Sequence, residues 1–417
     1  MTIKNALYAQ SGGVTAVINA SACAVIETAK SYTQQIGKVF AAKNGIIGVL
    51  HEELIDTSLE SDLDIANLKN TPGGAFGSCR YKLQSNGIEF ERLIEVFKAH
   101  NIGYFFYNGG GDSQDTANKI ADMSTSLGYP ITCIGIPKTV DNDLPFTDNC
   151  PGFGSVAKYT AISTMEAGFD VASMAASSTK VFILEVMGRH AGWIAASSGL
   201  AAENPSEAPH MILFPEIPFV EKNFLAAVKN CVEKNGYCVV VVSEGIRNDQ
   251  GKFISDIGLR DAFGHAQLGG VAPIISQLIK KELNLKYHWA VADYLQRAAR
   301  HISSAIDLEQ AYALGKAAVE FAIQGYNAIM PIIVREQDSP YKWSIGQVPL
   351  NKVANQERTM PKEFIRADGF GITDACRRYL LPLIQGEAYP PFHNGLPMYV
   401  KLNNKLIPKK LETHLTV

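Results

Sequence analysis

Strand-like and helix-like segments alternate along most of this chain, and that alternation limits the folds it can adopt. Apolar runs at residues 6–10, 102–107 and 131–136 have the character of strands, and helix-like stretches at 15–30 and up to residue 121 follow the first two. Such alternation predicts parallel sheets with crossover helices. A chain of 417 residues is long enough for two α/β domains of this kind, each with a sizeable core.

A second alternating series begins near residue 151, so we place a domain boundary at residues 150–154, between domains of residues 1–154 and 155–296. The series consists of helices at 155–172, from 189 and at 219–233, and strands at 180–187, 211–214 and 237–243. After it, residues 331–417 hold clustered prolines and lysines and a predicted helix at 373–384. We give this C-terminal section no chemistry and expect it to pack on the core, as a cap on the second domain or as part of a dimer interface.

Composition excludes several classes of protein. Apolar residues make up 47% of the chain and charged residues 19%, as in globular proteins. A net charge of −3 supplies no basic field for nucleic acid. The first residues lack the pattern of a secretory signal, and no apolar run reaches the roughly 18–20 residues of a membrane span. The seven cysteines show no zinc or CxxC spacing. We therefore expect a cytoplasmic protein with reduced thiols and no nucleic-acid or membrane partner.

Two loops follow the strands at 102–107 and 131–136. The first, which we call the glycine loop, is Asn-Gly-Gly-Gly-Asp-Ser at residues 108–113; the second, the acidic loop, is Pro-Lys-Thr-Val-Asp-Asn-Asp at 137–143. Loops at the carboxyl ends of neighbouring parallel strands are where open α/β sheets bind ligands. The glycine loop offers backbone N–H groups to a phosphate. The acidic loop supplies one cation and two carboxylates, which is what moving a phosphoryl group onto a hydroxyl requires.

Each loop has a structural explanation when it is considered alone. A glycine-rich turn between a strand and a helix is often only a turn, and Thr-Val-Asp-Asn-Asp at residues 139–143 could be a surface turn rich in Asx residues. A second glycine turn, Ser-Gly-Gly at 11–13, follows the first strand. Two such turns beside a lysine-aspartate loop favour a phosphate site.

These motifs closely resemble those of the phosphofructokinase family, and its pyrophosphate-dependent branch in particular. Members that use ATP carry Gly-Gly-Asp-Gly-Ser in the first loop and Pro-Gly-Thr-Ile-Asp-Asn-Asp in the second. Here Asp112 and Lys138 replace glycines, and the resemblance runs from Tyr8 to about Tyr326. It implies two Rossmann-like three-layer domains with parallel-rich sheets and an active-site cleft between them. It also implies that residues from about 297 to 330 rejoin the first domain.

The resemblance further implies a reaction: reversible transfer of phosphate from pyrophosphate to C1 of fructose 6-phosphate, with Mg²⁺, in glycolysis and gluconeogenesis, by a homodimer. An ATP-dependent 6-phosphofructokinase is the alternative enzyme, and a catalytically silent regulatory homologue is the alternative outside catalysis. Asp112 and Lys138 argue against the first, and a complete set of site residues argues against the second.

On the donor side, Asp141 resembles the family's catalytic base, which takes the proton from the sugar's 1-hydroxyl, and Asp143 assists it. Lys138 is expected to neutralise the transferred phosphoryl group, and Thr139 to hydrogen-bond its oxygens. The residues expected to bind the donor are Gly12, Gly13, Arg80, Lys82, Gly110, Gly111, Asp112 and Ser113. A solvated basic pair remains the alternative for Arg80 and Lys82.

Asp112 requires a physical account because a carboxylate repels phosphate. At about 4 Å and an effective dielectric constant of 20, it would repel a nucleotide's α-phosphate by about 4 kcal/mol per charge pair, roughly a thousandfold in affinity. Pyrophosphate ends before that position. The alternative is that Asp112 caps a helix starting at Ser113. The family's magnesium-binding aspartate is replaced by Gly111, so we expect Asp112 to ligate Mg²⁺, with Asp141, Asp143 or pyrophosphate as further ligands.

The sugar phosphate is expected to bind to the second domain. The resemblance assigns this role to Met187, Gly188, Arg189, Glu244, Tyr294 and Arg297, with Arg189 also facing the reacting phosphates and Arg297 clamping the 6-phosphate. The alternatives are a solvent-exposed arginine at a helix start for Arg189, a turn residue for Glu244 and a snorkelling surface arginine for Arg297.

Two further residues occupy places where short ATP-dependent members reach arginines across a subunit contact to the sugar phosphate. These are Lys180 and His288. The segment 264–270 has Leu268 where the family's arginine belongs, so we interpret it as a helix-start turn and give His265 no catalytic role.

Overall fold

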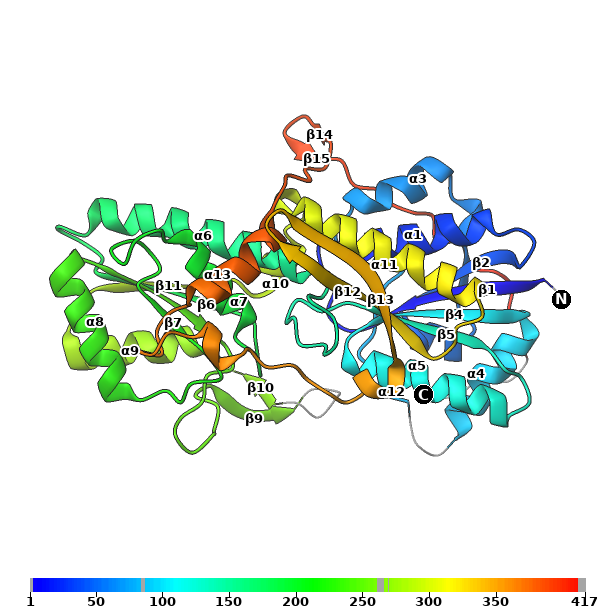
Figure 1. The fold of residues 1–417 in the computed structure, drawn as a ribbon, viewed down its shortest axis with the longest axis horizontal. Coiled ribbons are helices and arrows are strands. Elements are labelled where there is room, and N and C mark those ends of the chain that lie inside the picture. The colour runs from blue at the N-terminus through cyan, green and yellow to red at the C-terminus, as the bar shows by residue number, and fades with distance from the viewer. Residues whose placement is uncertain (1–2, 84–86, 261–265, 269, 412–417) are drawn as a thin grey trace.

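The computed structural model of the chain describes residues 3–83, 87–260, 266–268 and 270–411. Two α/β domains lie side by side along the long axis of the molecule (Figure 1). Each is a parallel-rich sheet with helices on both faces, and the α/β fold class expected from the sequence is confirmed. Among the described residues, no helix combines the length and apolar character needed to cross a membrane.

The first domain is built on a seven-stranded sheet in the order β13-β12-β5-β4-β1-β2-β3. Its strands are β1 (Lys4–Gln10), β2 (Ile36–Ala42), β3 (Leu54–Asp56), β4 (Ile102–Gly109), β5 (Thr132–Pro137), β12 (Ile329–Asp338) and β13 (Tyr341–Pro349). The two edge strands, β3 and β13, are antiparallel to their neighbours, and the five inner strands run parallel. The carboxyl ends of β1, β4 and β5 therefore meet at one edge of the sheet, where the glycine and acidic loops begin.

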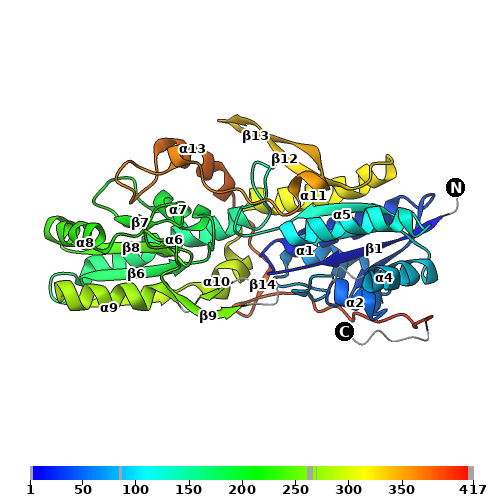
Figure 2. The ribbon, with the colours of Figure 1, turned by 90° about the horizontal axis from the view of Figure 1, so that it is seen from below.

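Alternating side chains of the inner strands fill two cores. Leu7 and Phe105 pack on one face and Tyr8 and Phe106 on the other, as the period of two in a strand requires. The first face is covered by α4 (Ile88–Ala99) and α5 (Gly111–Ser126), and the second by α1 (Ile18–Ser31) and α11 (Ala305–Ile323) (Figure 2). Smaller helices complete the domain: α2 (Ile46–Leu50), α3 (Asp62–Asn67) and α12 (Leu350–Val353).

The second domain holds a four-stranded parallel sheet in the order β11-β6-β8-β7. Its strands are β6 (Val181–Val186), β7 (Met211–Leu213), β8 (Cys238–Ser243) and β11 (Tyr287–Val291). Its helices are α6 (Phe153–Met174), α7 (Trp193–Ser197), α8 (Glu221–Asn235), α9 (Val271–Leu283) and α10 (Asp293–Ala298). The chain enters this domain through α6 and returns to the first through α11.

The C-terminal section is not one separate extension. Strands β12 and β13 belong to the first sheet, so the section expected to begin at residue 331 starts inside that domain. Helix α13 (Asp374–Leu380) then buries Cys376 and Leu380 in the core of the second domain. The chain finally returns to the first domain, where the N–H of Ile407 donates to the carbonyl of Leu54 at 2.9 Å.

Several predicted elements differ at their ends. The first helix begins at Ile18 rather than residue 15, and no helix starts at Arg189, because α7 begins only at Trp193. The predicted helix 373–384 is α13 followed by a 3₁₀ turn, Leu381–Ile384. Part of the predicted turn 264–270 is instead a strand, β10 (Ala266–Leu268), paired with β9 (Asp256–Arg260), while Gly264, His265 and Gly269 lie outside the described residues.

The remaining described elements are short. They are the hairpin strands β14 (Phe392–His393) and β15 (Leu396–Pro397) and the 3₁₀ helices Thr57–Leu59, Leu68–Asn70, Ser198–Ala201, Arg300–Ile302 and Lys362–Phe364.

Candidate active site

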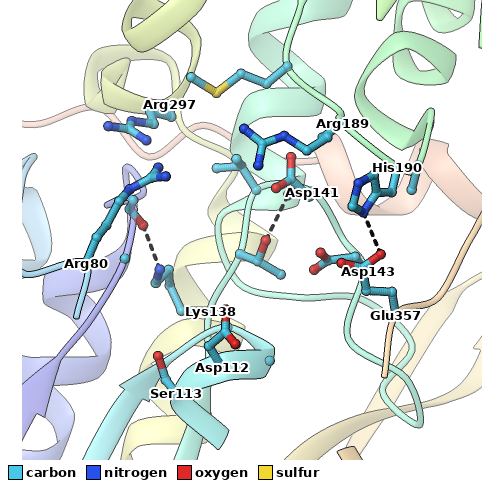
Figure 3. A pocket seen from close by; sticks show the side chains of 18 of the residues that line it. Arg80, Asp112, Ser113, Lys138, Asp141, Asp143, Arg189, His190, Arg297 and Glu357 are labelled. Carbon is cyan, nitrogen blue, oxygen red and sulfur yellow. Dashed lines mark hydrogen bonds and ion pairs between the residues drawn. The ribbon is translucent and has the colours of Figure 1, made fainter. Parts of the chain in front are cut away.

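A cavity of about 340 Å³ lies between the two domains, at the carboxyl ends of both sheets. It brings together most of the residues predicted from sequence. Those that line it are Gly12, Gly13, Arg80, Gly110, Gly111, Asp112, Ser113, Lys138, Thr139, Asp141, Asp143, Met187, Arg189, Glu244, Tyr294 and Arg297. Figure 3 shows the charged side chains pointing into this space from both domains.

The glycine loop has room for a ligand against its backbone. Strand β4 ends at Gly109 and α5 starts at Gly111, so the loop leads directly into the positive end of a 16-residue helix. A Cβ on Gly110 or Gly111 would meet no protein atom closer than 3.8 Å, and neither residue has a positive φ. Protein packing therefore does not require glycine at these two positions, whereas close approach of a phosphate does.

Asp112 does not cap the helix. The N-cap of α5 is Gly110 without a side-chain hydrogen bond, and Asp112 lies inside the first turn, where a negative charge suits the helix dipole. Its Oδ1 lies 3.7 Å from Nζ of Lys82, and both side chains are partly exposed. Lys82 itself is not among the residues lining the cavity, so it acts on the site through Asp112.

Lys138 is the most buried charge of the site, with 4% of its surface exposed. Its Nζ donates a hydrogen bond to the carbonyl of Gly13 at 2.6 Å, which ties the acidic loop to the first glycine turn. Gly12 in that turn has φ +76°, a conformation that favours glycine. Burial, followed by the nearby charges of Arg297 and Arg80, lowers the pKa of Lys138 to about 8. A bound anion would raise the pKa of Lys138 again, because its negative charge favours the protonated ammonium.

The two aspartates of the acidic loop have raised pKa values. Burial, followed by the charges of Asp143 and Glu244, raises the pKa of Asp141 to about 7. Burial also raises the pKa of Asp143. Thr139 lies between them: its Oγ1 accepts the N–H of Asp141 at 3.1 Å, and its hydroxyl hydrogen-bonds the Asp143 carboxylate. Thr139 therefore orients both aspartates in this structure, in addition to lining the cavity.

The ends of β6 and β8 form the facing wall. Gly188 has φ +131°, and its N–H donates to Oε1 of Glu244 at 3.4 Å. A Cβ on Gly245 would collide with the main chain of Arg189, so the two strand ends require this glycine to approach each other. Burial raises the pKa of Glu244, and Arg189 opposes that shift. Arg189 lies beside Asp141, where the two domains face each other (Figure 3).

Three cations from different elements converge near Gly13. A Cβ on Gly13 would collide with the guanidinium of Arg297 and would lie 3.7 Å from Nη2 of Arg80. Lys138 approaches the same turn from below, and Arg297 also lies 3.9 Å from the ring centroid of Tyr294. Three positive charges this close repel one another, so the arrangement is suited to binding a multiply charged anion.

Lys180 and His288 lie outside the cavity. Lys180 precedes β6, at the end of the strand remote from the cleft, and its ammonium is hydrogen-bonded to the carbonyl of Ala175. His288 is exposed on the edge strand β11, opposite Phe182. Both residues therefore lie outside the cavity of their own chain, and their contact with the sugar phosphate across a subunit boundary stays a prediction.

Sequence reasoning missed three ionisable residues that line the cavity: His190, Asp293 and Glu357. Nδ1 of His190 lies 2.7 Å from Oε2 of Glu357. His190 and Asp293 adjoin predicted residues and could have been found by extending those motifs. Glu357 comes from the C-terminal section, and no local motif marks it.

One cluster of soft metal ligands lies apart from the cleft. The ligand atoms of His210, Cys231 and Cys238 lie within 4.8 Å of one another, although no sequence spacing indicated it. Nδ1 of His210 accepts the N–H of Val239 at 3.0 Å, and Nε2 lies 3.2 Å from the carbonyl of Ser206. Because these bonds occupy both ring nitrogens, we assign no metal to the cluster.

The fold and the cleft together define a class: a two-domain α/β protein with a cation-lined anion site at facing sheet edges. The chain belongs to the phosphofructokinase family, whose model (Phosphofructokinase) matches residues 5–322.

Similar proteins extend over the full length of the chain. A protein of Methylococcus capsulatus named pyrophosphate–fructose 6-phosphate 1-phosphotransferase is 63% identical, with all of both chains covered. A protein of the same name from Halomonas elongata is 61% identical over 99% of each. The crystal structure of a pyrophosphate-dependent phosphofructokinase from Marinobacter aquaeolei, at 63% identity, superposes with a TM-score of 0.92 over 100% of both chains.

Proposed function

We propose that this protein transfers a phosphoryl group from pyrophosphate to the C1 hydroxyl of fructose 6-phosphate, giving fructose 1,6-bisphosphate and phosphate, and that the reaction is reversible. The observation that carries the proposal is the arrangement of the cleft. Buried Lys138 and half-buried Asp141 lie beside an open glycine loop, and the Asp112 carboxylate lines the same cavity. The names of the full-length relatives support the same donor and acceptor.

The donor is pyrophosphate because a nucleotide would meet the charge of Asp112. The full repulsion, about 4 kcal/mol at 4 Å and an effective dielectric constant of 20, applies to an unscreened carboxylate. Here Lys82 lies 3.7 Å away and Asp112 is partly exposed, so we reduce the expected discrimination to about 10- to 100-fold. This still favours pyrophosphate over ATP.

Asp141 acts as general base. It takes the proton from the C1 hydroxyl as that oxygen attacks the phosphorus atom, and the bond from phosphorus to the bridging oxygen breaks. A pKa of about 7 places this carboxyl close to the pH at which a base is most effective. Lys138 and Arg189 stabilise the charge on the transferred group and on the leaving phosphate, and Asp143, held by Thr139, supports the orientation of Asp141.

The acceptor is held by the second domain. Met187 lines the sugar site, Glu244 accepts hydrogen bonds from sugar hydroxyls, and Tyr294 and Arg297 bind the 6-phosphate. Gly188, which was predicted to bind the sugar, is not among the residues that line the cavity, and its N–H instead donates to Glu244. Arginine suits this role because its planar fork can donate two parallel hydrogen bonds to a phosphate. The guanidinium of Arg297 lies close to Gly13 of the first domain, so Arg297 belongs to the boundary between the two halves of the cleft.

Mg²⁺ is the proposed cofactor. The cavity offers hard carboxylate oxygens on Asp112, Asp141 and Asp143, the ligand type that Mg²⁺ prefers, and pyrophosphate brings further oxygens. The residues therefore fit the ion, with Asp112 the ligand on the donor side. When bound, the ion neutralises charge on the phosphate oxygens.

We further propose that the protein is a cytoplasmic homodimer that works in glycolysis and gluconeogenesis. The exposed edge strand β11, with Trp289 45% exposed, supports an interface on the second domain. Such an interface would bring Lys180 and His288 of one chain towards the sugar site of the other.

The initial rate of fructose 1,6-bisphosphate formation, with Mg²⁺ and fructose 6-phosphate, tests the function directly. We expect turnover with pyrophosphate and none above background with ATP. Turnover with ATP alone would overturn the donor assignment and support an ATP-dependent 6-phosphofructokinase. No turnover with either, together with tight binding of fructose 6-phosphate, would indicate a regulatory homologue.

A further inference from the structure

Residues 354–361 of the C-terminal section cross from the first domain to the second alongside the cleft. On one side, Nδ2 of Asn355 donates to Oδ1 of Asp115 on α5 at 3.1 Å. On the other, the N–H of Met360 donates to Oε1 of Glu216, after β7, at 3.1 Å. The phosphofructokinase family model ends at residue 322, so this crossing segment lies outside the part of the chain that defines the family.

Arg358, in the middle of the crossing segment, binds the main chain of the connection between β5 and α6. Its Nη1 donates to the carbonyls of Thr147 at 2.7 Å and Asp148 at 2.9 Å, and its Nη2 donates to the carbonyl of Asn142 at 2.9 Å. Its own N–H donates to the carbonyl of Asp143 at 2.6 Å. Arg358 is thus hydrogen-bonded to four carbonyls of the connection, two in the acidic loop and two further along the chain.

The connection needs such support because it has little regular structure. It runs from Lys138 to Gly152 without a helix or strand, and Asn142 within it has φ +56°. In a loop of this kind, side chains have to satisfy the backbone carbonyls that a sheet or helix would otherwise pair. Asn142 and Asn149 are fully buried, so an unsatisfied carbonyl at this depth would be costly.

The Arg358 guanidinium is itself held in place. It lies 4.9 Å from the ring of Trp193, a residue of α7 in the second domain, whose Nε1 donates to the Arg358 carbonyl at 3.4 Å. The preceding residue, Glu357, lines the cavity and is hydrogen-bonded to His190. A shift of residue 358 would therefore move the acidic loop and the rim of the cavity together.

We propose that Arg358 is a positioning residue for phosphoryl transfer. It holds Asp141 and Asp143 in their reacting orientation through the carbonyls of Asn142 and Asp143 and those of Thr147 and Asp148 further along the loop. This inference rests on the proposed function of the site. Arginine is required because its fork of five N–H donors can serve three carbonyls at once, whereas a lysine ammonium is a point charge on a flexible stem. Arg358 is not among the residues that line the cavity, so its loss should lower kcat and leave substrate KM values little changed.

The test compares Arg358→Lys and Arg358→Ala with wild type and with Arg366→Lys. Arg366 is the matched control, because it also belongs to the C-terminal section but pairs with the exposed Asp368. Since a misplacement of about 1 Å can cost on the order of 100-fold in rate, we expect R358A to lose about 100-fold or more in kcat, with KM for fructose 6-phosphate changed less than about threefold. R358K should recover little, and low concentrations of guanidinium should partly restore R358A.

Hydrogen exchange of the peptide covering residues 138–152 gives a second readout that does not depend on turnover. We expect faster exchange there in R358A than in wild type and R366K, with unchanged exchange in β1 and β4. If wild type itself shows no turnover, the proposed function fails while this readout still decides the role of Arg358. A kcat within threefold of wild type, or unchanged exchange in 138–152, overturns the proposal, even if R358A melts at a lower temperature.

Discussion

The donor half and the acceptor half of the cleft are built differently. The donor half lies at the centre of a seven-stranded sheet, and its key cation, Lys138, is 4% exposed and tied to Gly13. The acceptor half lies on a four-stranded sheet beside the edge strand β11, and Tyr294 in it is 61% exposed. The donor half is centred on a buried cation, whereas the acceptor half includes an aromatic residue that is mostly exposed to solvent.

This difference indicates how the two halves contribute. Buried charges have shifted pKa values and act strongly on a phosphoryl group, because little water screens them. An exposed site binds a sugar phosphate through the arrangement of its hydrogen-bonding groups, and a neighbouring chain can supply further groups. We therefore expect changes in the donor half to affect kcat most, and changes in the acceptor half to affect KM for the sugar.

The largest effect is expected for Asp141→Asn. An amide of the same size cannot accept the hydroxyl proton, so kcat should fall by about 10³- to 10⁴-fold, while KM for fructose 6-phosphate changes little. Steady-state rates with pyrophosphate measure this. Asp170→Asn, on the exposed end of α6, is the control. A D141N enzyme within tenfold of wild type would show that another group is the base.

Lys138→Met should come next. Removing the buried ammonium takes away charge stabilisation of the transferred group, which costs about 10²- to 10³-fold in kcat/KM for pyrophosphate. Lys119→Met, which removes an exposed lysine paired with Asp115 on α5, should have no comparable effect. If K138M instead raised only KM for fructose 6-phosphate, the division between the two halves would be wrong.

Substitutions of Asp112 test whether its charge keeps ATP out of the donor half. Asp112→Asn removes the charge with little change in size, and Asp112→Gly also opens space, so ATP affinity should rise about tenfold in the first and further in the second. Binding of ATP measured by calorimetry distinguishes charge from volume. No gain in either variant would refute the repulsion argument.

The pH dependence should come from the donor half. Asp141, with its pKa raised to about 7, must be deprotonated, so kcat/KM for pyrophosphate should fall as pH drops below about 7. Lys138, with its pKa lowered to about 8, must be protonated, so the same quantity should fall as pH rises above about 8. Each limb approaches tenfold per pH unit. In Lys138→Arg the alkaline limb should disappear, and its persistence would assign that limb to another group.

The smallest effect is expected in the acceptor half. His288→Ala should raise KM for fructose 6-phosphate by only a few fold, and only in a dimer, because His288 lies outside the cavity of its own chain. Lys286→Ala, an exposed change just before β11, is the control. An unchanged KM in a protein shown to be dimeric by light scattering would exclude His288 from the sugar site.

Residues that adjoin each other in the chain were predicted well. Lys138, Asp141 and Asp143 lie in one loop after a strand, and Gly110 to Ser113 in another, and the structure places all of them in the cavity. Parallel strands with alternating helices bring such loops to one edge, so local pattern was sufficient to place them.

The places of the other residues in and around the cavity could be assigned only from the tertiary structure. The sequence by itself determined the α/β class, the two loops that line the cavity and the family's motifs, because each depends on neighbours within a few residues. The fold decided that Glu357 lines the cavity, that Arg358 is hydrogen-bonded to the acidic loop and that Lys180 and His288 lie outside the cavity. Arg358 and Asn142 are 216 residues apart. Their contact forms only when the two domains and the crossing segment fold together, so no local sequence pattern predicts it.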